Sequence, residues 1–407
     1  MNIIGVIAEY NPFHNGHHYH LKTTREKTNA DYIVVVMSSS FVQRGEPAIF
    51  DKMDRTKMAL LNGADAVIEL PVLYSTASAE YFAKASIKLF NDMGCVNIVS
   101  FGSESGSIKE LEQIADILID EPKEWKEEFK KQLSFGCTYP VARANALNQF
   151  LNINSELLTN PNNILAIEYL KALKLFHSNI SPVTIQRKGA HYHDFDIKQN
   201  TASASAIRKS IEQNQMQFLS SQMPQNCYEI LRNAITQGNA PIYFKNFSSV
   251  LNYRLRTMHL NELKNILDVT EGLENRILRS IDSNYEIKDI CEFIKTKRYT
   301  YTKIQRILTH ILLDIKKENF HYFNEKGFSQ YIRILGFKKE SQKLIQLITK
   351  SASIPILINT KKMSSVLTND GLKMLELEIK ATNLHCMMSP NPIYRKPNKD
   401  FLFPIIM

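Results

Sequence analysis

The sequence predicts an α/β protein with a doubly wound parallel sheet, followed by a mainly helical C-terminal region that carries a small α/β appendage. Two observations lead to this fold class. Strand-like and helix-like segments alternate over residues 1–210, as a parallel sheet requires. Helical periodicity rich in Leu, Ile, Lys and Arg then continues over residues 227–316. We therefore expect domains at residues 1–215, 227–330 and 336–407.

The expected strands are short apolar runs that end at turn signals. The first stops before the turn-forming pair Asn11-Pro12, the second is a continuous apolar run typical of a strand buried on both faces, and the third ends at Pro71. The expected strands are residues 3–7, 31–37, 66–70, 96–101 and 183–186, and the expected helices are 17–26, 52–61, 76–90 and 163–176. Polar residues 220–226 are the expected linker, and residues 354–358 are the one strand-like run in the last portion.

Composition excludes several classes of protein. The 407 residues contain 44% hydrophobic residues, enough for substantial cores, but no apolar run approaches the length of a membrane span. Glu9 interrupts the first apolar segment and no basic region precedes it, so we expect no signal peptide. The five cysteines are scattered without a C-x-x-C pair, which argues against disulfide and zinc-ribbon frameworks and for a cytoplasmic protein. The net charge of +9 fits either a solvated surface or a polyanionic partner.

The loop after the first strand contains a His-x-Gly-His motif at His14 to His17. A helix is expected to begin there, and a helix start favours phosphate through its backbone N–H groups and partial positive charge. The imidazoles of His14 and His17 could donate to the charge that develops on a leaving pyrophosphate. The motif therefore predicts a nucleotide site and an enzyme. A zinc site built from His14 and His18 or from His17 and His20 lacks any accompanying Cys or second metal motif, so we expect no protein-bound metal.

Other polar residues follow the ends of further expected strands. Ligands of doubly wound sheets bind at the carboxyl ends of the strands, where residues 38–40, Gly102 and Arg187 also fall. Gly102 would let the backbone approach a ring or ribose closely. Arg44 could bind a phosphate or carboxylate, or be a surface cation. One Asn in residues 160–163 is expected to cap a helix, and a spare amide could read an adenine edge.

A second helix start carries hydroxyl groups and a cation. Ser203 and Ser205 stand at the start of an expected helix, with Arg208 one turn later. This arrangement could bind phosphate, although a plain capped helix would look the same. A site formed from both ends of one domain would explain it better.

These motifs resemble those of the nucleotidyltransferase superfamily with the His-x-Gly-His signature. The second motif of that superfamily, Ser-Ser-Thr-x-Ile-Arg, is present as residues 203–208 with departures at Ala204 and Ser205. More narrowly, the chain resembles the bacterial tRNA(Met) cytidine acetate ligases along its whole length. The segments that carry this narrower resemblance are residues 9–17, 43–47, 55–60, 161–166, 297–300 and 306–308.

The resemblance implies a Rossmann-like domain and an ATP-dependent ligase that activates acetate as acetyl-adenylate. The ligase would then acetylate N4 of the wobble cytidine of elongator tRNA(Met). His14 and His17 would be catalytic, stabilising the phosphoryl-transfer transition state. Mg²⁺ bridging the phosphates is expected, although no dedicated carboxylate pair is evident. The implied ATP-binding residues are Ile7, Ala8, Glu9, Tyr10, Asn11, Pro12, Phe13, His14, Asn15, Gly16, His17, His18, Tyr19, His20, Gly102, Asn162 and Arg187.

The helical region offers basic residues interleaved with tyrosines. Such a surface could contact the tRNA backbone and stack on unpaired bases, or it could be a solvated helix face. The candidate tRNA-binding residues are Arg254, Arg256, Lys297, Arg298, Tyr299, Lys303 and Arg306. No stable protein partner is evident. Residues 362–365 resemble the Lys-Met-Ser-Lys-Ser loop of class I aminoacyl-tRNA synthetases, but they lack the second Lys and lie outside the α/β domain, so we interpret the likeness as coincidence.

Two other functions are compatible with parts of this pattern. A small-molecule adenylyltransferase acting on a phosphate acceptor could use the same nucleotide site, but the long basic helical region is more than such a substrate needs. A non-catalytic RNA-binding protein with a vestigial nucleotide site would not need intact His14, Gly16 and His17.

Overall fold

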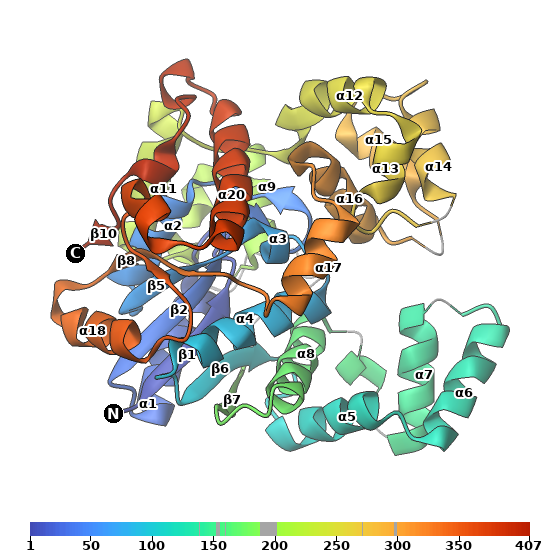
Figure 1. Cartoon of the computed structure of the whole chain (residues 1–407), viewed down its shortest axis with the longest axis horizontal. Helices are drawn as coiled ribbons and strands as arrows, with labels where there is room; N and C mark the ends of the chain where they lie inside the picture. The colour runs from blue at the N-terminus through green and yellow to red at the C-terminus, as the bar shows by residue number, and fades with distance from the viewer. Residues whose placement is uncertain (138, 152–154, 159, 188–201, 271, 297–298) are drawn as a thin grey trace.

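One mixed sheet with helices on both faces organises the chain in a computed structural model (Figure 1). The structure describes residues 1–137, 139–151, 155–158, 160–187, 202–270, 272–296 and 299–407. The strand order is β10-β8-β5-β2-β1-β6-β7, with β9 paired to β8. The parallel strands are β1 (Ile3–Ala8), β2 (Tyr32–Ser38), β5 (Ala66–Leu70), β6 (Ile98–Ser103) and β7 (Ser181–Gln186).

The predicted doubly wound sheet is confirmed by this order. From β1 the chain steps one way to β2 and β5 and then crosses to β6 and β7 on the other side. The order therefore reverses between β1 and β6, and ligands of open α/β sheets bind at the carboxyl ends of the strands at such a reversal.

Alternate residues of the strands enter two separate cores. In β2, Val34 and Val36 join the core on one face, whereas Ile33, Val35 and Met37 join the core on the other. A strand covered on both faces has no polar side, which explains the continuous apolar run in the sequence.

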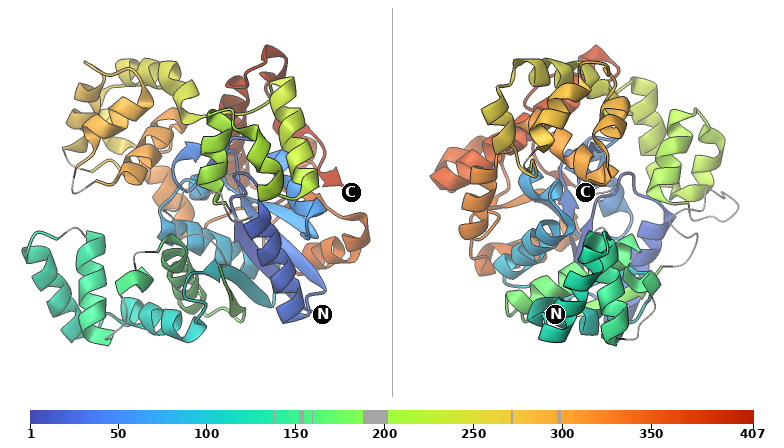
Figure 2. Two further views of the ribbon diagram at one scale, coloured as in Figure 1. Left: turned by 180° about the vertical axis from the view of Figure 1, so that it is seen from behind. Right: turned by 90° about the vertical axis from the view of Figure 1, so that its right-hand side faces the viewer.

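Helices from distant parts of the sequence cover each face. The views from behind and in front show α1, α9 and α11 over one face and α4 and α18 over the other (Figures 1 and 2). The first face is covered by α1 (Asn15–Thr28), α2 (Lys52–Leu61), α9 (Ala204–Glu212) and α11 (Gln225–Gln237). The second face is covered by α4 (Ala79–Met93), α8 (Pro161–Leu175), α18 (Gln342–Ser351) and α20 (Asn369–Met387).

Two helical parts stand beside the sheet (Figure 1). One is a lobe of α12 (Ser248–Thr257), α13 (Leu260–Asn265), α14 (Leu273–Ser280), α15 (Ile287–Ile294) and α16 (Tyr301–Leu313). The other is an arm of α6 (Lys123–Ser134) and α7 (Tyr139–Leu151), which follows α5 (Ile108–Asp120). The short remaining elements are β3 (Phe41–Val42), β4 (Glu46–Pro47), α3 (Val72–Ser75), α10 (Leu219–Gln222), α17 (Lys317–Glu325) and α19 (Met363–Val366).

Two expectations about the organisation of the chain are wrong. The expected linker at residues 220–226 is largely helical, because Leu219 and Met223 are buried in the core on the α2 side of the sheet.

The last portion of the chain is not an appendage. β8 (Ile332–Phe337) pairs antiparallel with β5, and β10 (Ile405–Ile406) pairs with β8. The expected boundary at Gly336 therefore falls inside a strand of the main sheet. The expected strand at residues 354–358 is reduced to β9 (Ile356–Leu357), paired with β8. Boundaries at 1–215 and 227–330 stay predictions.

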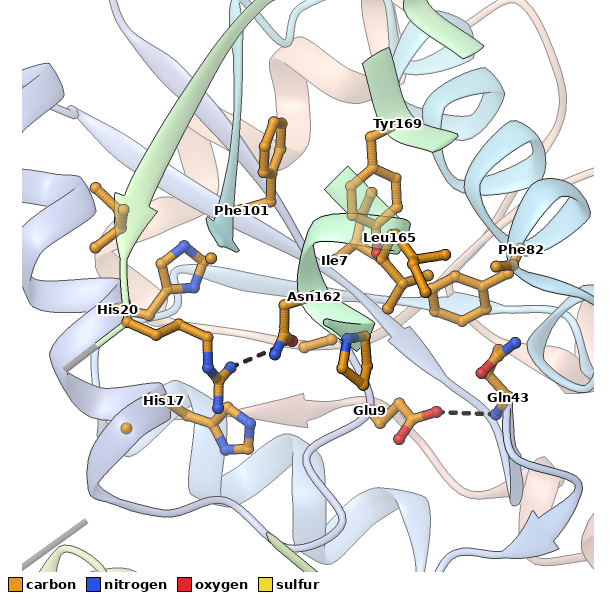
Figure 3. Close-up of a pocket in the computed structure, with 18 of the residues that line it drawn as sticks. Ile7, Glu9, His17, His20, Gln43, Phe82, Phe101, Asn162, Leu165 and Tyr169 are labelled. Atoms are coloured by element: carbon orange, nitrogen blue, oxygen red, sulfur yellow. Dashed lines mark hydrogen bonds between the residues drawn. The ribbon is translucent and has the colours of Figure 1, made fainter. Parts of the chain in front are cut away.

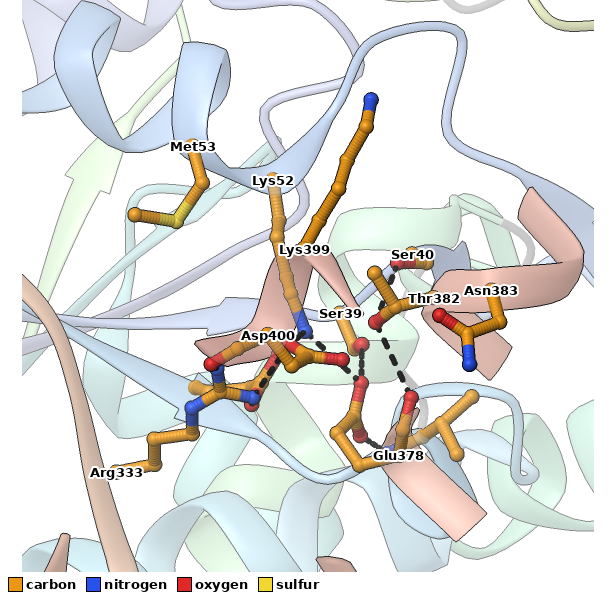
Figure 4. Close-up of polar contacts among 12 residues, drawn as sticks. Ser39, Ser40, Lys52, Met53, Arg333, Glu378, Thr382, Asn383, Lys399 and Asp400 are labelled. Carbon is orange, nitrogen blue, oxygen red and sulfur yellow. Dashed lines mark hydrogen bonds and ion pairs between the residues drawn. The ribbon is translucent and has the colours of Figure 1, made fainter. Parts of the chain in front are cut away.

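A buried cluster of charged residues fixes the last portion of the chain to the sheet (Figure 4). Lys52 Nζ lies 2.6 Å from Glu69 Oε1 and 2.6 Å from Asp400 Oδ1. Arg333 Nη1 lies 2.8 Å from Glu69 Oε2 and 2.7 Å from the same Asp400 oxygen. Because all four side chains are at most 6% exposed, each charge depends on its partners for stabilisation.

Glu378 adds a third carboxyl group to this cluster. Its Oε1 lies 3.4 Å from Lys52 Nζ, and its Oε2 accepts a hydrogen bond of 2.7 Å from Val72 N–H. Burial and the neighbouring Glu69 raise the pKa of Glu378 to about 8. A protonated Glu378 at neutral pH leaves two cations facing two carboxylates, so the buried charges balance.

Removing one cation should therefore destabilise the fold strongly. We expect Arg333→Ala to lower the free energy of unfolding by about 3–5 kcal/mol, since Glu69 and Asp400 would keep a single shared cation in a buried site. Urea denaturation measures the change. Lys84→Ala, which removes a partly exposed pair with Glu80, is the control and should cost less than about 1 kcal/mol. Equal losses in the two variants would show that the cluster is not a major source of stability.

The raised pKa of Glu378 also predicts how stability depends on pH. Between its ordinary value of 4.5 and about 8, folded Glu378 holds a proton that the unfolded chain releases. The contribution of this group to stability is therefore present below pH 4.5 and is lost as the pH rises to about 8. Glu378→Gln cannot titrate, so the wild-type chain should lose stability relative to the variant as the pH increases from 5 to 8. Parallel denaturation curves across that interval would contradict the assignment.

Candidate active site

A cavity of about 520 Å³ lies where the strand order reverses, at the carboxyl ends of β1, β6 and β7 (Figure 3). Its described lining combines apolar and polar side chains from the sheet, from α1, α4 and α8, and from α16 of the helical lobe. The described lining includes Ile7, Glu9, His17, His20, Gln43, Arg44, Phe82, Gly102, Asn162, Leu165, Tyr169, Arg187 and Thr302.

Two arginines hold the loop between β1 and α1 by its carbonyl groups. Arg55 is fully buried and donates from Nη1 to Glu9 O at 2.8 Å and to Ser38 O at 2.9 Å, so one guanidinium joins the ends of β1 and β2. Arg208 Nη1 donates to Asn11 O at 2.9 Å, and its Nη2 lies 2.7 Å from Glu46. The loop is therefore positioned before any ligand binds.

His14 and His17 cap α1 with their own imidazole rings. Gly16 N–H donates to Nδ1 of His14 at 3.0 Å, and His14 N–H donates to Nδ1 of His17 at 3.3 Å. Both Nδ1 atoms are acceptors in this network, which assigns the ring proton of each neutral imidazole to Nε2. The rings stack with centroids 3.8 Å apart, and His14 is buried behind His17, which lines the cavity. Of the backbone N–H groups at this helix start, that of Gly16 is used inside the cap.

Burial keeps the histidines uncharged. Burial and the neighbouring Arg187 lower the pKa of His14 to about 3 and that of His20 to about 4, and burial together with His14 lowers the pKa of His17 well below 6.5. At neutral pH His17 therefore presents an N–H donor and no positive charge. In the described lining of the cavity, the positive charge comes from Arg44 and Arg187.

On the opposite wall of the cavity, Glu104, which directly follows β6, binds the start of α8. Glu104 accepts from Asn162 Nδ2 at 2.6 Å and from Asn163 N–H at 2.9 Å. Asn162 Oδ1 in turn accepts from Arg187 Nη1 at 3.4 Å. A Cβ atom on Gly102 would lie 3.4 Å from Cγ of Arg187, an ordinary van der Waals contact, so the arginine side chain packs directly over the glycine.

The structure brings most of the predicted nucleotide residues to the cavity. Those in the described lining are Ile7, Ala8, Glu9, Tyr10, Gly16, His17, Tyr19, His20, Gly102, Asn162 and Arg187, together with Arg44. Asn11, Pro12, Phe13 and His14 are buried residues of the loop itself and are not in the described lining, and His18 is exposed to solvent. Asn15 Nδ2 donates to Ser221 O. The roles of all these residues stay predictions.

The second predicted phosphate motif, residues 203–208, packs against the loop between β1 and α1. Ser203 caps α9 by accepting from Ala206 N–H at 3.2 Å, and Arg208 is engaged with Asn11 and Glu46 as described. Ser205 Oγ lies 3.5 Å from Arg44 Nη1 and so connects α9 to a residue of the cavity. In this arrangement the motif supports the loop and Arg44.

Sequence reasoning missed several lining residues. Gln43 follows β3 and could have been found from its place after a strand end. Phe82, Leu165 and Tyr169 appear in the sequence as ordinary apolar positions of helices. Thr302 comes from the lobe, and only the tertiary packing of α16 brings it to the cavity.

The predicted tRNA-binding residues differ in their surroundings. Arg256 is exposed, and Lys303 Nζ lies 5.2 Å from the ring centre of Tyr299. Arg254 Nη2 lies 2.7 Å from Asp314, and Arg306, whose side chain is 13% exposed, lies 3.8 Å from Asp268. Lys297 and Arg298 lie outside the described residues. Of the described set Arg256 is exposed, whereas Lys303 is partly buried and contacts the ring of Tyr299.

Neither a metal centre nor a membrane span is found in the described ranges. No group of three or more His, Cys, Asp or Glu side chains there could hold a metal ion. No helix there has the length and apolar character needed to cross a membrane.

Comparisons with known proteins agree over the full length of the chain. The family model HIGH Nucleotidyl Transferase matches residues 1–400. The tRNA(Met) cytidine acetate ligases of Thermoanaerobacter sp. (strain X514) and Acetivibrio thermocellus are 42% and 41% identical to this chain, with 100% of each chain covered. The crystal structure of Thermotoga maritima TmcAL bound with alpha-thio ATP matches with a TM-score of 0.92 at 34% identity, and the apo structure matches with 0.94, each with complete coverage of both chains. The chain thus belongs to the HIGH nucleotidyltransferases and, among them, to the tRNA(Met) cytidine acetate ligase family.

Proposed function

We propose that this protein is an ATP-dependent ligase that activates acetate as acetyl-adenylate and acetylates N4 of the wobble cytidine of elongator tRNA(Met). The observation that carries the proposal is the cavity at the sheet reversal, which joins the His-x-Gly-His helix start to a residue of the basic helical lobe. One relative of known structure, Thermotoga maritima TmcAL, was crystallised with alpha-thio ATP. A tRNA substrate implies a cytoplasmic location.

In the first step, an acetate oxygen attacks the α-phosphorus of ATP and pyrophosphate leaves. Negative charge develops on the phosphate oxygens, and the Nε2–H of His17 and the guanidinium of Arg187 are the donors that would stabilise it. His14 would act mainly through His17, because it is stacked behind that ring and holds the start of α1.

ATP is expected to bind as its Mg²⁺ complex, so the metal is part of the substrate. Mg²⁺ commonly keeps several waters and takes phosphate oxygens with one or two carboxylates. Within the described part of the cavity lining the carboxylate is Glu9, and Glu104 is already engaged by Asn162 and Asn163. Glu9 and Glu104 therefore do not form a dedicated metal site.

A direct test incubates the protein with ATP, labelled acetate and tRNA. Label that appears in tRNA and depends on ATP supports the proposal. Pyrophosphate release with transfer to a small phosphate acceptor, and no label in tRNA, would favour an adenylyltransferase instead.

Different roles are expected for the two histidines of the motif. His17→Ala should lower acetate-dependent ATP–pyrophosphate exchange by about 10²–10³-fold, because a donor to the transition state is removed. His14→Ala should lower the same rate and also the melting temperature, since the N-cap of α1 contributes about 1 kcal/mol. Both variants should still bind tRNA.

Glu26→Ala, which removes an exposed side chain near the end of α1, is the matched control. Loss of tRNA binding in step with loss of exchange would contradict the separation of the nucleotide and tRNA sites. A stable His17→Ala protein with normal exchange would remove His17 from the reaction.

Arg256 and Lys303 of the lobe should contribute to tRNA binding. Arg256→Ala and Lys303→Ala should each weaken tRNA binding and reduce the slope of log K against log salt by about one for each phosphate that the variant no longer neutralises. Filter binding over a range of salt concentrations measures both effects. Lys343→Ala, an exposed lysine on α18, is the control. If the lobe variants keep the wild-type slope, these residues form a solvated helix face and do not bind tRNA.

A further inference from the structure

The cavity has two chemically different ends (Figure 3). His17 and His20 lie on one side of the view, with Asn162 and its hydrogen bond to Arg187 beside them. Glu9, Gln43 and Phe82 lie on the other side. The first end has the imidazole and guanidinium donors of His17 and Arg187, whereas the second has the Glu9 carboxylate with Arg44 beside it and an aromatic wall.

The second end lies against the helical lobe. Thr309 on α16 donates from Oγ1 to Gly45 O at 2.9 Å, so α16 packs on the loop that carries Gln43 and Arg44. From the same helix, Thr302 enters the cavity lining. A macromolecule bound to the lobe would therefore reach the cavity from the side of Glu9.

Glu9 is held at this end by its neighbours. Its Oε1 accepts from Gln43 N–H at 2.9 Å, and its backbone carbonyl is bonded to Arg55. The charged groups that act on it include Arg44, Arg208, Glu46 and Arg55, and the titratable hydroxyl of Tyr169 also interacts with it. Burial raises the pKa of Glu9, and Arg44, the Gln43 N–H and Arg208 only partly offset this effect. A carboxylate with a raised pKa is better matched to accepting a proton near neutral pH.

We propose that the end of the cavity formed by Glu9, Gln43, Phe82 and Tyr169 is the subsite for the acceptor cytosine, and that the Glu9 carboxylate takes the proton released by its amine. This inference rests on the proposed function. A flipped base is commonly held against aromatic and apolar side chains by hydrogen bonds to its Watson–Crick edge, and a carboxylate is the natural acceptor for the N4 amine of cytosine. Phe82, Leu165 and Tyr169 provide the apolar surface.

The transfer step balances with Glu9 in this role. The cytosine N4 attacks the carbonyl carbon of acetyl-adenylate and a C–N bond forms. The bond between that carbon and the phosphate oxygen breaks, and AMP leaves with the electron pair. The amine proton passes to Glu9, which releases it to solvent afterwards.

The experiment separates the two steps of the reaction. Acetate-dependent ATP–pyrophosphate exchange reports adenylate formation, and single-turnover transfer from preformed acetyl-adenylate to tRNA reports the second step. The resemblance places Glu9 among the ATP-binding residues, so some loss of exchange is expected in Glu9→Gln. The inference requires a much larger loss of transfer, about 10²-fold or more, the usual contribution of a general base. The rate of transfer by the wild-type protein should decrease as the pH is lowered below the pKa of Glu9. This decrease at acid pH should be absent in Glu9→Gln. Glu9→Asp should recover part of the transfer rate.

Glu80→Gln is the matched control, because Glu80 is on α4 next to the cavity residue Ala79 and pairs with Lys84 outside the cavity. Equal loss of exchange and transfer in Glu9→Gln, or a raised KM for MgATP, would assign Glu9 to the nucleotide and overturn the inference. Unchanged transfer would also overturn it. If the wild-type protein itself fails to acetylate tRNA, the proposed function is overturned instead, and this outcome is seen before any variant is made.

Discussion

The buried guanidinium of Arg55 is the interaction on which the site depends. It bonds carbonyl groups at the ends of β1 and β2, including those of Glu9, Ser38 and Ser39. Burial lowers the pKa of Arg55 to about 10, so it is still charged at neutral pH. Lys52, one turn earlier on α2, pairs with Glu69 on β5 and with Asp400 from the last portion of the chain. One helix therefore links the loop of the active site to the far edge of the sheet.

The strands that can be predicted from sequence are those whose side chains are apolar on both faces. In β2 the pattern predicts the strand correctly because no polar residue interrupts the run from Ile33 to Met37. In β8 the run is broken by Arg333, a residue that is expected at the surface unless a partner is known. Its partners, Glu69 and Asp400, are far away in the sequence, so only the folded structure shows that this arginine is a core residue.

The site could be predicted to the extent that it follows strand ends. Gly102 and Arg187 reach the cavity for that reason, and His17 reaches it through the motif at the start of α1. Sequence position could not show that His14 and His17 accept hydrogen bonds within their own helix cap, or that their pKa values are lowered. Nor could it distinguish a paired cation such as Arg306 from an exposed one such as Arg256, because that distinction depends on the packing of the lobe.

The place of Asp400 in the buried cluster has a consequence for how the protein is made. On a ribosome the sheet strands β1 to β7 emerge early, yet Lys52 and Arg333 lack one of their carboxylate partners until residue 400 has been synthesised. The buried cluster therefore cannot be complete until residue 400 has joined it. A nascent or truncated chain that lacks residues 332–337 would also leave β5 without its antiparallel neighbour β8, and so would carry an open sheet edge that other chains could pair with.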